Sequence, residues 1–173
     1  MKEQELRQQF IQAGTGDKSA FAAIYHDMKS PVYTVICRIV RSRETAEDVT
    51  QELFLKLYQS PPDSSVRNIR AWIFQIAHNL ALNALKKKSS VELSEDMTDN
   101  DIPMDEAVCS RLDLDRALQV LSPEEREIVA LHLTADLSFK EIAGIVGTSL
   151  PAVYRKYRKA LKSLQFTLNG GIK

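Results

Sequence analysis

The chain has little of what several protein classes require. Its 173 residues include two cysteines and three histidines, and no apolar run approaches the ~20 residues that span a bilayer. The N-terminus MKEQELRQQF is too polar for a secretory signal. Cys37 lies in the apolar stretch VICRIV and Cys109 borders acidic residues, which favours a core thiol and a surface thiol over a disulfide. We therefore expect a cytoplasmic protein with no direct membrane insertion.

The sequence also lacks the usual signs of catalysis or cofactor binding. His26, His78 and His132 are scattered, and no ligand pair lies at helical spacing beside a cysteine. The segment GTG at residues 14–16 lacks the following lysine and the strand context of a phosphate-binding loop. We expect no metal site, no cofactor and no enzymatic activity.

Net charge is zero overall, but it is unevenly distributed along the chain. Residues 1–88 hold 13 basic and 9 acidic side chains, residues 89–117 hold 2 and 9, and residues 118–173 hold 8 and 5. Two mildly basic blocks thus flank an acidic connector. A phosphate backbone responds to local patches of charge, so the neutral total does not exclude a nucleic-acid partner.

The first block has helical periodicity almost throughout. Leu6 and Phe10 predict a first helix, and Asp17 is placed to cap a second. Pro31 suits the first turn of a third helix, and Thr45 and Asp48 lie near the start of a fourth. Paired prolines then predict a loop in SPPDSSVRN, followed by the long helix IRAWIFQIAHNLALNALKKK with an apolar seam of Ile69, Ile73, Ile76 and Leu80.

The second block contains the strongest helix-boundary signals. Ser122, Pro123 and Glu125 form a helix start with a capping box, and Ser138 and Glu141 form another. Gly147 is expected to end the second of these helices. Thr148 and Ser149 would cap a basic helix with an apolar stripe of Val153, Tyr157, Leu161 and Leu164. This arrangement is typical of a helix-turn-helix, although an ordinary amphipathic pair with a solvated charged face is the alternative.

These patterns predict an all-α fold of two small helical bundles joined by an acidic flexible linker. The expected divisions are an N-terminal domain at 1–88, the linker at 89–107 and a C-terminal helix-turn-helix domain at 108–173. No alternating strand pattern of useful length and no internal repeat is present.

Several of these segments, in order, resemble one family. AEDVTQELFLKLYQ, IRAWIFQIAHNLALNALKKK, LSPEEREIVALHL and SFKEIAGIVGTSLPAVYRKYRKALKSL are similar to segments of extracytoplasmic-function (ECF) sigma factors, the minimal two-domain group of bacterial sigma factors. The resemblance implies a subunit that binds core RNA polymerase and directs transcription from promoters with −10 and −35 elements. It also implies that the acidic linker threads the basic channel of the polymerase.

The resemblance implies three groups of binding residues. Asp48, Gln51 and Glu52 would dock on the basic coiled coil of the polymerase β′ subunit; a solvated helix face is the alternative. The melted −10 strand would contact Trp72, His78, Asn79, Asn83, Lys86, Lys87 and Lys88, with loop 60–68 receiving an extruded base. The −35 duplex would contact Leu150, Ala152, Tyr154, Arg155, Arg158, Lys159 and Lys162.

This sequence departs from the family's usual residues at three of these positions and at Pro151 beside them. His78 and Asn83 stand where arginine and aspartate are commoner, and Pro151 and Tyr154 stand where small or polar residues are commoner. Trp72 lies beside Ile73 at helical spacing, which favours a core position over a stacking platform.

Factors of this family are commonly held inactive by an anti-sigma protein, often at the membrane, so we expect such a partner. Two other functions are the alternatives. A stand-alone helix-turn-helix repressor would not need the polar face of Asp48, Gln51 and Glu52, and a decoy that sequesters an anti-sigma factor would not need the cations from Arg155 to Lys162.

Overall fold

The computed structural model describes residues 1–92 and 118–168, and every regular element in these two ranges is a helix. The chain forms α1 (Glu3–Gly14), α2 (Lys18–Val40), α3 (Arg43–Gln59), α4 (Ile69–Glu92), α6 (Pro123–Leu133), α7 (Phe139–Val146) and α8 (Leu150–Leu168). The predicted all-α class is confirmed. Most of the predicted linker and the first part of the predicted C-terminal domain, including Cys109, lie outside the described residues.

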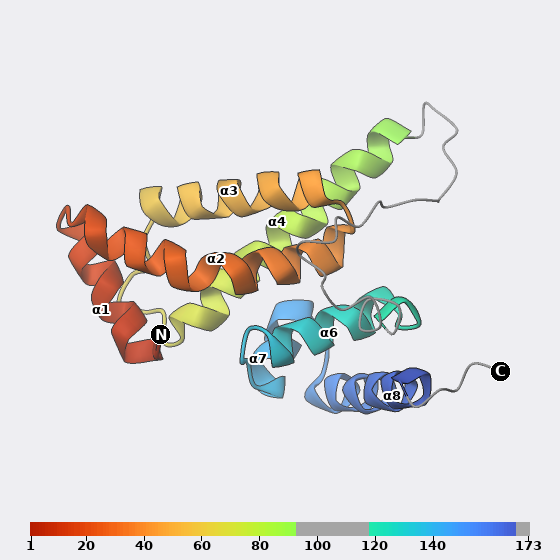
Figure 1. Cartoon of the computed structure of the whole chain (residues 1–173). Coiled ribbons are helices and arrows are strands. Elements are labelled where there is room, and N and C mark those ends of the chain that lie inside the picture. Colours follow the sequence, from red (N-terminus) through yellow and green to blue (C-terminus); the bar gives the residue numbers. More distant parts are fainter. Residues whose placement is uncertain (93–117, 169–173) are drawn as a thin grey trace.

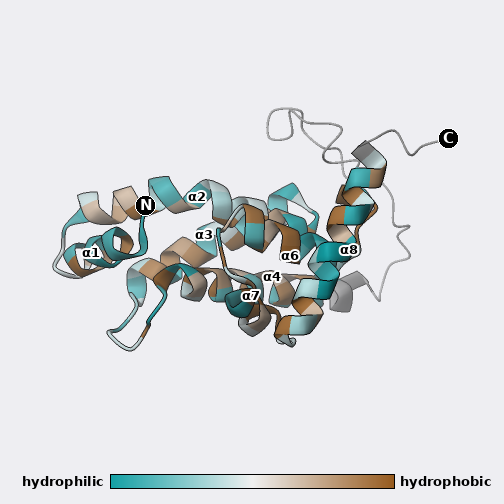
Figure 2. Cartoon of the chain, turned by 90° about the horizontal axis from the view of Figure 1, so that it is seen from below, coloured by the Kyte–Doolittle hydropathy of each residue, from teal (hydrophilic) through white to brown (hydrophobic). Residues whose placement is uncertain are grey.

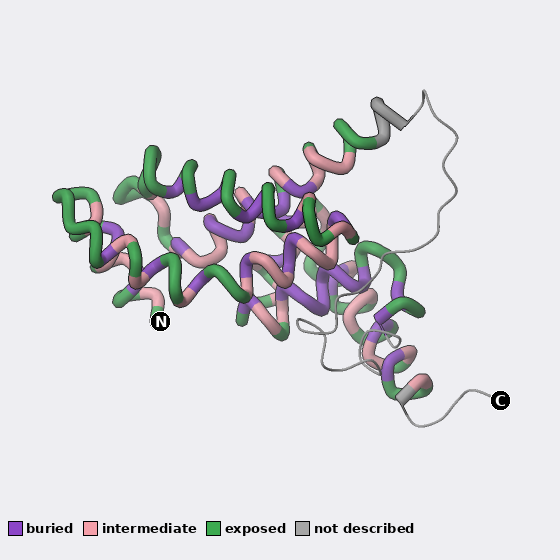
Figure 3. Tube along the Cα trace, turned by 45° about the horizontal axis from the view of Figure 1, so that its top comes forward, coloured by how far each residue is buried: buried purple, intermediate pink, exposed green. Residues whose placement is uncertain are grey.

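Helices α1 to α4 form an N-terminal bundle organised around α2, which packs against the other three (Figure 1). Leu6 and Phe10 of α1 are buried as expected, and the Asp17 carboxylate accepts hydrogen bonds from the backbone N–H groups of Ser19 and Ala20 at the start of α2. Burial of one face of each helix removes apolar area from water at roughly 25 cal/mol per Å². In Figure 3 the buried residues accordingly recur along the inner sides of the helices, with exposed residues along the outside.

The prediction of a separate helix starting at Pro31 is wrong. Residues 18–40 form one continuous helix with Pro31 inside it. A proline in a helix interior removes one backbone hydrogen bond and costs about 3 kcal/mol. The apolar face continues across it from Ala20 through Met28 and Val32 to Val40, all buried, and this continuous burial offsets the local cost.

Two other boundaries also differ from the prediction. Helix α3 starts at Arg43, with the Ser42 hydroxyl accepting a hydrogen bond from Thr45 N–H, because an earlier serine offers a better N-cap than Thr45. Helix α4 extends to Glu92, beyond the predicted end at Lys88. Of its predicted seam, Ile69 and Ile73 are buried and Ile76 and Leu80 are half-buried, whereas Phe74, Ala77 and Ala81 are buried.

Helices α6 to α8 form a C-terminal bundle in which the predicted helix starts at Ser122 and Ser138 and the predicted helix end at Gly147 are confirmed. Ser122 and Ser138 each take part in a capping box, with Glu125 and Glu141 as the reciprocal partners. Gly147 ends α7 at φ +67°, a left-handed conformation in which glycine carries no Cβ penalty. Figure 2 shows hydrophilic and hydrophobic residues alternating along α8, as its predicted stripe requires.

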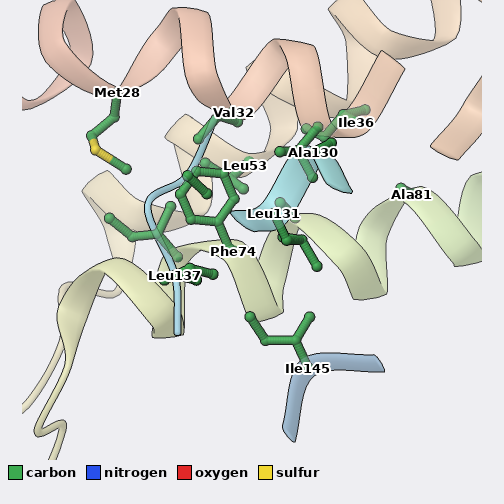
Figure 4. Close-up of a cluster of buried hydrophobic side chains, with 14 of the residues drawn as sticks. Met28, Val32, Ile36, Leu53, Phe74, Ala81, Ala130, Leu131, Leu137 and Ile145 are labelled. Carbon is green, nitrogen blue, oxygen red and sulfur yellow. The ribbon is translucent and has the colours of Figure 1, made fainter. Parts of the chain in front are cut away.

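The two bundles pack against each other, a placement that the sequence patterns did not predict. Helix α6 lies against α2 and α7 lies against α4, and one hydrophobic cluster includes residues of both bundles. Figure 4 shows Phe74 of α4 near Val32 of α2 and Leu131 of α6. We call this contact between α2/α4 and α6/α7 the docking interface.

Candidate polymerase and nucleic-acid interfaces

The three residues of the predicted polymerase site lie together on the outer face of α3. Asp48, Gln51 and Glu52 are all exposed, because Val49, Leu53 and Leu57 turn the opposite face into the core. The Oε1 atom of Glu52 lies 3.5 Å from the Nζ atom of Lys56 one turn later. The face is therefore a solvated polar surface with two carboxylates, which suits a cationic partner.

Sequence reasoning missed two exposed apolar side chains on the same helix. Leu55 is 60% exposed and Tyr58 is 58% exposed. The Tyr58 ring packs edge-on against Phe21 of α2 at a centroid distance of 5.1 Å. The sequence could have predicted their exposure. Both residues lie outside the apolar stripe formed by Val49, Leu53 and Leu57, and an apolar residue outside the buried stripe of a helix remains at the surface.

The residues of α4 that are predicted to contact the melted −10 strand lie in two environments, one exposed to solvent and one covered by neighbouring helices. Asn79, Asn83, Lys86, Lys87 and Lys88 are exposed. Trp72 is half-buried and packs against the core, as the helical spacing favoured. His78 is only 8% exposed, and its Nδ1 atom lies 2.5 Å from Oε1 of Glu127 on α6.

The loop before α4 is anchored by side chains of α1. The Arg7 guanidinium donates hydrogen bonds to the carbonyl oxygens of Val66 (2.7 Å) and Arg67 (3.1 Å). The Glu3 carboxylate accepts hydrogen bonds from the backbone N–H groups of Ile69 and Arg70 at 2.7 and 3.3 Å. These bonds satisfy donors at the start of α4 that have no intrahelical partner, so α1 fixes the end of the loop that enters α4.

Helix α8 presents its cations away from the core. Leu150, Tyr154, Arg155, Arg158, Lys159 and Lys162 are exposed and Ala152 is half-buried. Val153, Ala160 and Leu164 are buried on the inner face. The Arg158 guanidinium carbon lies 5.8 Å from the centre of the Tyr154 ring, within cation–π range. The structure thus brings the whole predicted duplex-binding set onto one helix.

Two lysines of α8 form ion pairs with α6. Nζ of Lys159 lies 2.8 Å from Oε1 of Glu125, and Lys156 pairs with Glu124. Burial by itself would raise the pKa of Glu125, but the hydrogen bonds from Lys159 and Ser122 together outweigh it and hold this pKa below its usual value. A phosphate that bound Lys159 would therefore compete with a carboxylate already in place.

The packing of α8 depends on an aromatic cluster. The Phe139 ring stacks on His132 at 4.5 Å and lies 4.9 Å from Tyr157 and 5.8 Å from Tyr154. The Nδ1 atom of His132 is 2.8 Å from the carbonyl oxygen of Leu137. Tyr154 therefore has one edge on this cluster and the rest in solvent, next to the exposed arginines.

The described residues hold neither a metal-binding cluster nor a membrane-spanning helix. In residues 1–92 and 118–168, no group of three or more histidine, cysteine, aspartate or glutamate side chains could hold a metal ion. None of the helices within those ranges combines the length and the apolarity needed to cross a bilayer.

Family models match both bundles. Residues 24–91 match sigma-70 region 2 and residues 111–164 match sigma-70 region 4. The ECF RNA polymerase sigma factor SigK of several mycobacteria is similar over nearly the whole chain. The protein from Mycobacterium bovis is 26% identical over 164 residues, with 88% of each chain covered. The protein from Mycobacterium ulcerans is 25% identical over 173 residues, with 91% of this chain and 90% of the relative covered.

Two solved structures share the fold. The sigma factor RpoE of Bartonella quintana, in complex with the anti-sigma factor NepR, has a TM-score of 0.69 at 20% identity and covers 87% of this chain and 97% of its own. CnrH, in complex with the cytosolic domain of CnrY, has a TM-score of 0.65 at 22% identity and covers 95% and 97%. Sigma factors regulate transcription and do not catalyse a reaction of their own. With both sigma-70 regions present in order, the chain belongs to the ECF family of RNA polymerase sigma factors.

Proposed function

We propose that this sigma factor divides its work between separate surfaces. The acidic face of α3 binds the β′ coiled coil of core RNA polymerase, the exposed part of α4 holds the melted −10 strand, and α8 reads the −35 duplex. The observation that carries the proposal is the exposure of opposite charges on different bundles: Asp48 and Glu52 on α3, and Arg155, Arg158 and Lys162 on α8.

Charge complementarity supports this assignment. Carboxylates on α3 suit a basic protein surface and repel DNA, whereas arginines on α8 can pair with guanine in bidentate fashion and lysines can neutralise phosphates. A stand-alone repressor has no use for the α3 face, and a decoy has no use for the α8 cations. Both rival functions are therefore disfavoured.

We also propose that an anti-sigma protein binds this chain. In the two solved structures with the same fold, RpoE is bound to the anti-sigma factor NepR and CnrH is bound to the cytosolic domain of CnrY. Leu55 and Tyr58 add exposed apolar surface beside the acidic face of α3, and such surface commonly marks a protein interface. Co-purification of a partner that contacts these residues would test this proposal.

Charge reversal on α3 tests the polymerase site. We expect Asp48→Lys with Glu52→Lys to weaken binding to purified core polymerase at least about tenfold, because two carboxylates become cations opposite a basic surface. The circular dichroism spectrum should not change, since both residues are exposed. The control is Glu5→Lys, a charge reversal at an exposed residue of α1. Unchanged polymerase binding by the double variant would refute the assignment.

Loss of arginines from α8 tests the duplex site. Arg155→Ala with Arg158→Ala should reduce promoter-dependent transcription, each arginine contributing about 1–3 kcal/mol of discrimination if it pairs with a base. Polymerase binding should be retained. Lys18→Ala, which removes an exposed cation at the far end of α2, serves as control. Equal loss of polymerase binding and promoter use would contradict the division of surfaces.

A further inference from the structure

The loop at residues 60–68 joins α3 to α4, and its tip is exposed. Figure 1 shows the loop running past α1 to reach the start of α4, and Asp63, Ser64 and Ser65 at the tip are open to solvent. A surface loop of this kind samples several conformations unless other groups hold it, and a ligand that orders it on binding loses affinity. A loop that receives a single base is therefore more selective when its backbone is held in place beforehand.

Two hydrogen bonds within the loop shape its backbone locally. The Asp63 carboxylate accepts a hydrogen bond from the Ser65 backbone N–H at 2.7 Å, which closes a turn at the tip. Where the loop ends, the Asn68 side-chain oxygen accepts a hydrogen bond from the Ala71 N–H at 2.8 Å and caps α4. Both bonds join near neighbours in the chain, so they shape the loop without placing it relative to the N-terminal bundle.

Two side chains of α1 place the loop relative to the bundle. The Arg7 guanidinium holds the carbonyl oxygens of residues 66 and 67, and the Glu3 carboxylate holds the N–H groups of residues 69 and 70. Nη2 of Arg7 and Oε1 of Glu3 lie 3.6 Å apart, so the two side chains also steady each other. Hydrogen bonds with a charged partner are about twice as strong as neutral ones. We call these two side chains the α1 brace.

The α1 brace extends from a firmly anchored helix. Leu6 and Phe10 bury α1 in the N-terminal core, and α1 packs against both α2 and α4. Arg7 and Glu3 are half-buried beside this core. The position of the loop is therefore set by the packed interior of the N-terminal bundle.

Glu3 has a second effect at the start of α4. Its carboxylate lies at the positive, N-terminal end of the helix dipole, a place that would otherwise attract a DNA phosphate. With this place occupied by a carboxylate, contact between the loop and a base is favoured over contact between the loop and the sugar-phosphate backbone.

We propose that Arg7 and Glu3 are positioning residues for promoter recognition, which hold loop 60–68 in the conformation that accepts an extruded base of the melted −10 strand. Neither side chain has to touch DNA, because both act through the backbone of the loop. The inference rests on the proposed function, since it takes α4 and the loop before it as the site of the melted strand. Loss of the α1 brace should therefore weaken base preference at one −10 position and leave the other positions unchanged.

A promoter library tests the effect on base preference. Promoter fragments randomised over the −10 and −35 elements are transcribed by the reconstituted holoenzyme, and sequencing of the transcripts gives the preference at each position. Arg7→Met keeps much of the side-chain length but removes the donors. We expect it to reduce the ratio of best to worst base at one −10 position at least about fivefold, which corresponds to the loss of about one hydrogen bond to the base.

Two further variants distinguish positioning from general damage. Arg7→Lys still carries a cation that can donate to the two carbonyl oxygens, so it should keep most of the preference. Gln8→Met changes an exposed neighbour on α1 and should leave every preference as in the wild type. An Arg7→Met profile identical to the wild type, or one weakened equally at every −10 and −35 position, overturns the inference.

Amide hydrogen exchange in the free chain tests the α1 brace without DNA. The first N–H groups of a helix have no intrahelical partner, so protection of the Ile69 and Arg70 amides depends on Glu3. We expect Glu3→Ala to speed exchange of these two amides at least about fivefold by NMR, the effect of losing about one hydrogen bond at each. Exchange in α3 should not change. Unchanged exchange at both amides overturns the inference.

The two readouts separate this inference from the proposed function. If the wild-type holoenzyme shows no base preference at any −10 position, the proposed function fails and the positioning role fails with it. If the wild type shows a preference that Arg7→Met leaves intact, only the positioning role fails. In both cases the exchange rates still report whether α1 holds the loop.

Discussion

Three neighbouring residues of α6 show how a side chain's role depends on the surface it meets. Glu125 accepts hydrogen bonds from Ser122 at the helix start and pairs with Lys159 of α8. Arg126 donates to the carbonyl oxygens of Leu118 and Leu121, and burial, followed by the charges of Arg41 and Arg38, lowers its pKa. Glu127 reaches the other bundle. All three are buried, so each requires its own partner.

The lowered pKa of Glu125 predicts a particular pH dependence. A carboxyl group with a depressed pKa in the folded state stabilises the fold above its unfolded-state pKa of about 4.3, and this contribution is lost as pH falls through the folded value. We expect Glu125→Gln to lower the melting temperature at pH 7 and the gap to the wild type to narrow as the pH falls below about 4.3. Thermal unfolding of both proteins at several pH values measures this difference in melting temperature. A gap that does not change with pH would show that the charge of Glu125 does not contribute.

At the scale of the element, the caps determine where most helices begin and end. Asp17, Ser122, Ser138 and Gly147 act as the sequence predicted. The errors arose where a local signal competed with packing or with another residue nearby. Pro31 is a strong start signal, but the buried face on both sides of it kept α2 continuous.

The two glycines at α7 give a paired prediction. Gly147 has φ +67°, so Gly147→Ala should destabilise the fold by roughly 1–2 kcal/mol. Gly144 lies inside α7 with nothing within 4 Å of an added Cβ, so Gly144→Ala should stabilise it by about 0.5–1 kcal/mol. Urea denaturation followed by circular dichroism measures both. Effects of the same sign would contradict the assigned backbone conformation at one of the two positions.

At the scale of the whole molecule, the shared core links the stability of the two bundles. Leu131 of α6 has no exposed area and belongs to the larger cluster, whereas Leu164 of α8 belongs to a smaller cluster within the C-terminal bundle. Trp72, the single tryptophan, lies on α4 and reports on the N-terminal bundle. Unfolding of that bundle should therefore respond to a cavity made in the other one.

We expect Leu131→Ala to cost about 2–5 kcal/mol and to lower the unfolding midpoint followed by Trp72 fluorescence. Leu164→Ala removes the same side chain from the smaller cluster and should lower that midpoint less. If Leu131→Ala leaves the Trp72 midpoint unchanged, the bundles unfold independently and the docking interface contributes no stability to the N-terminal bundle.

The helical class, most helix ends and the exposed faces of α3 and α8 follow from local patterns in the chain. These features depend on residues within a few positions of one another, such as Ser138 with Glu141 or the stripe from Val153 to Leu164, and spacing along one helix is visible in the chain. The packing of α6 on α2 and of α7 on α4 is visible only in the folded chain. The His78–Glu127 and Asn68–Glu141 contacts join residues 49 and 73 positions apart. Such contacts have no local periodicity, because they arise from the packing of two separately patterned surfaces.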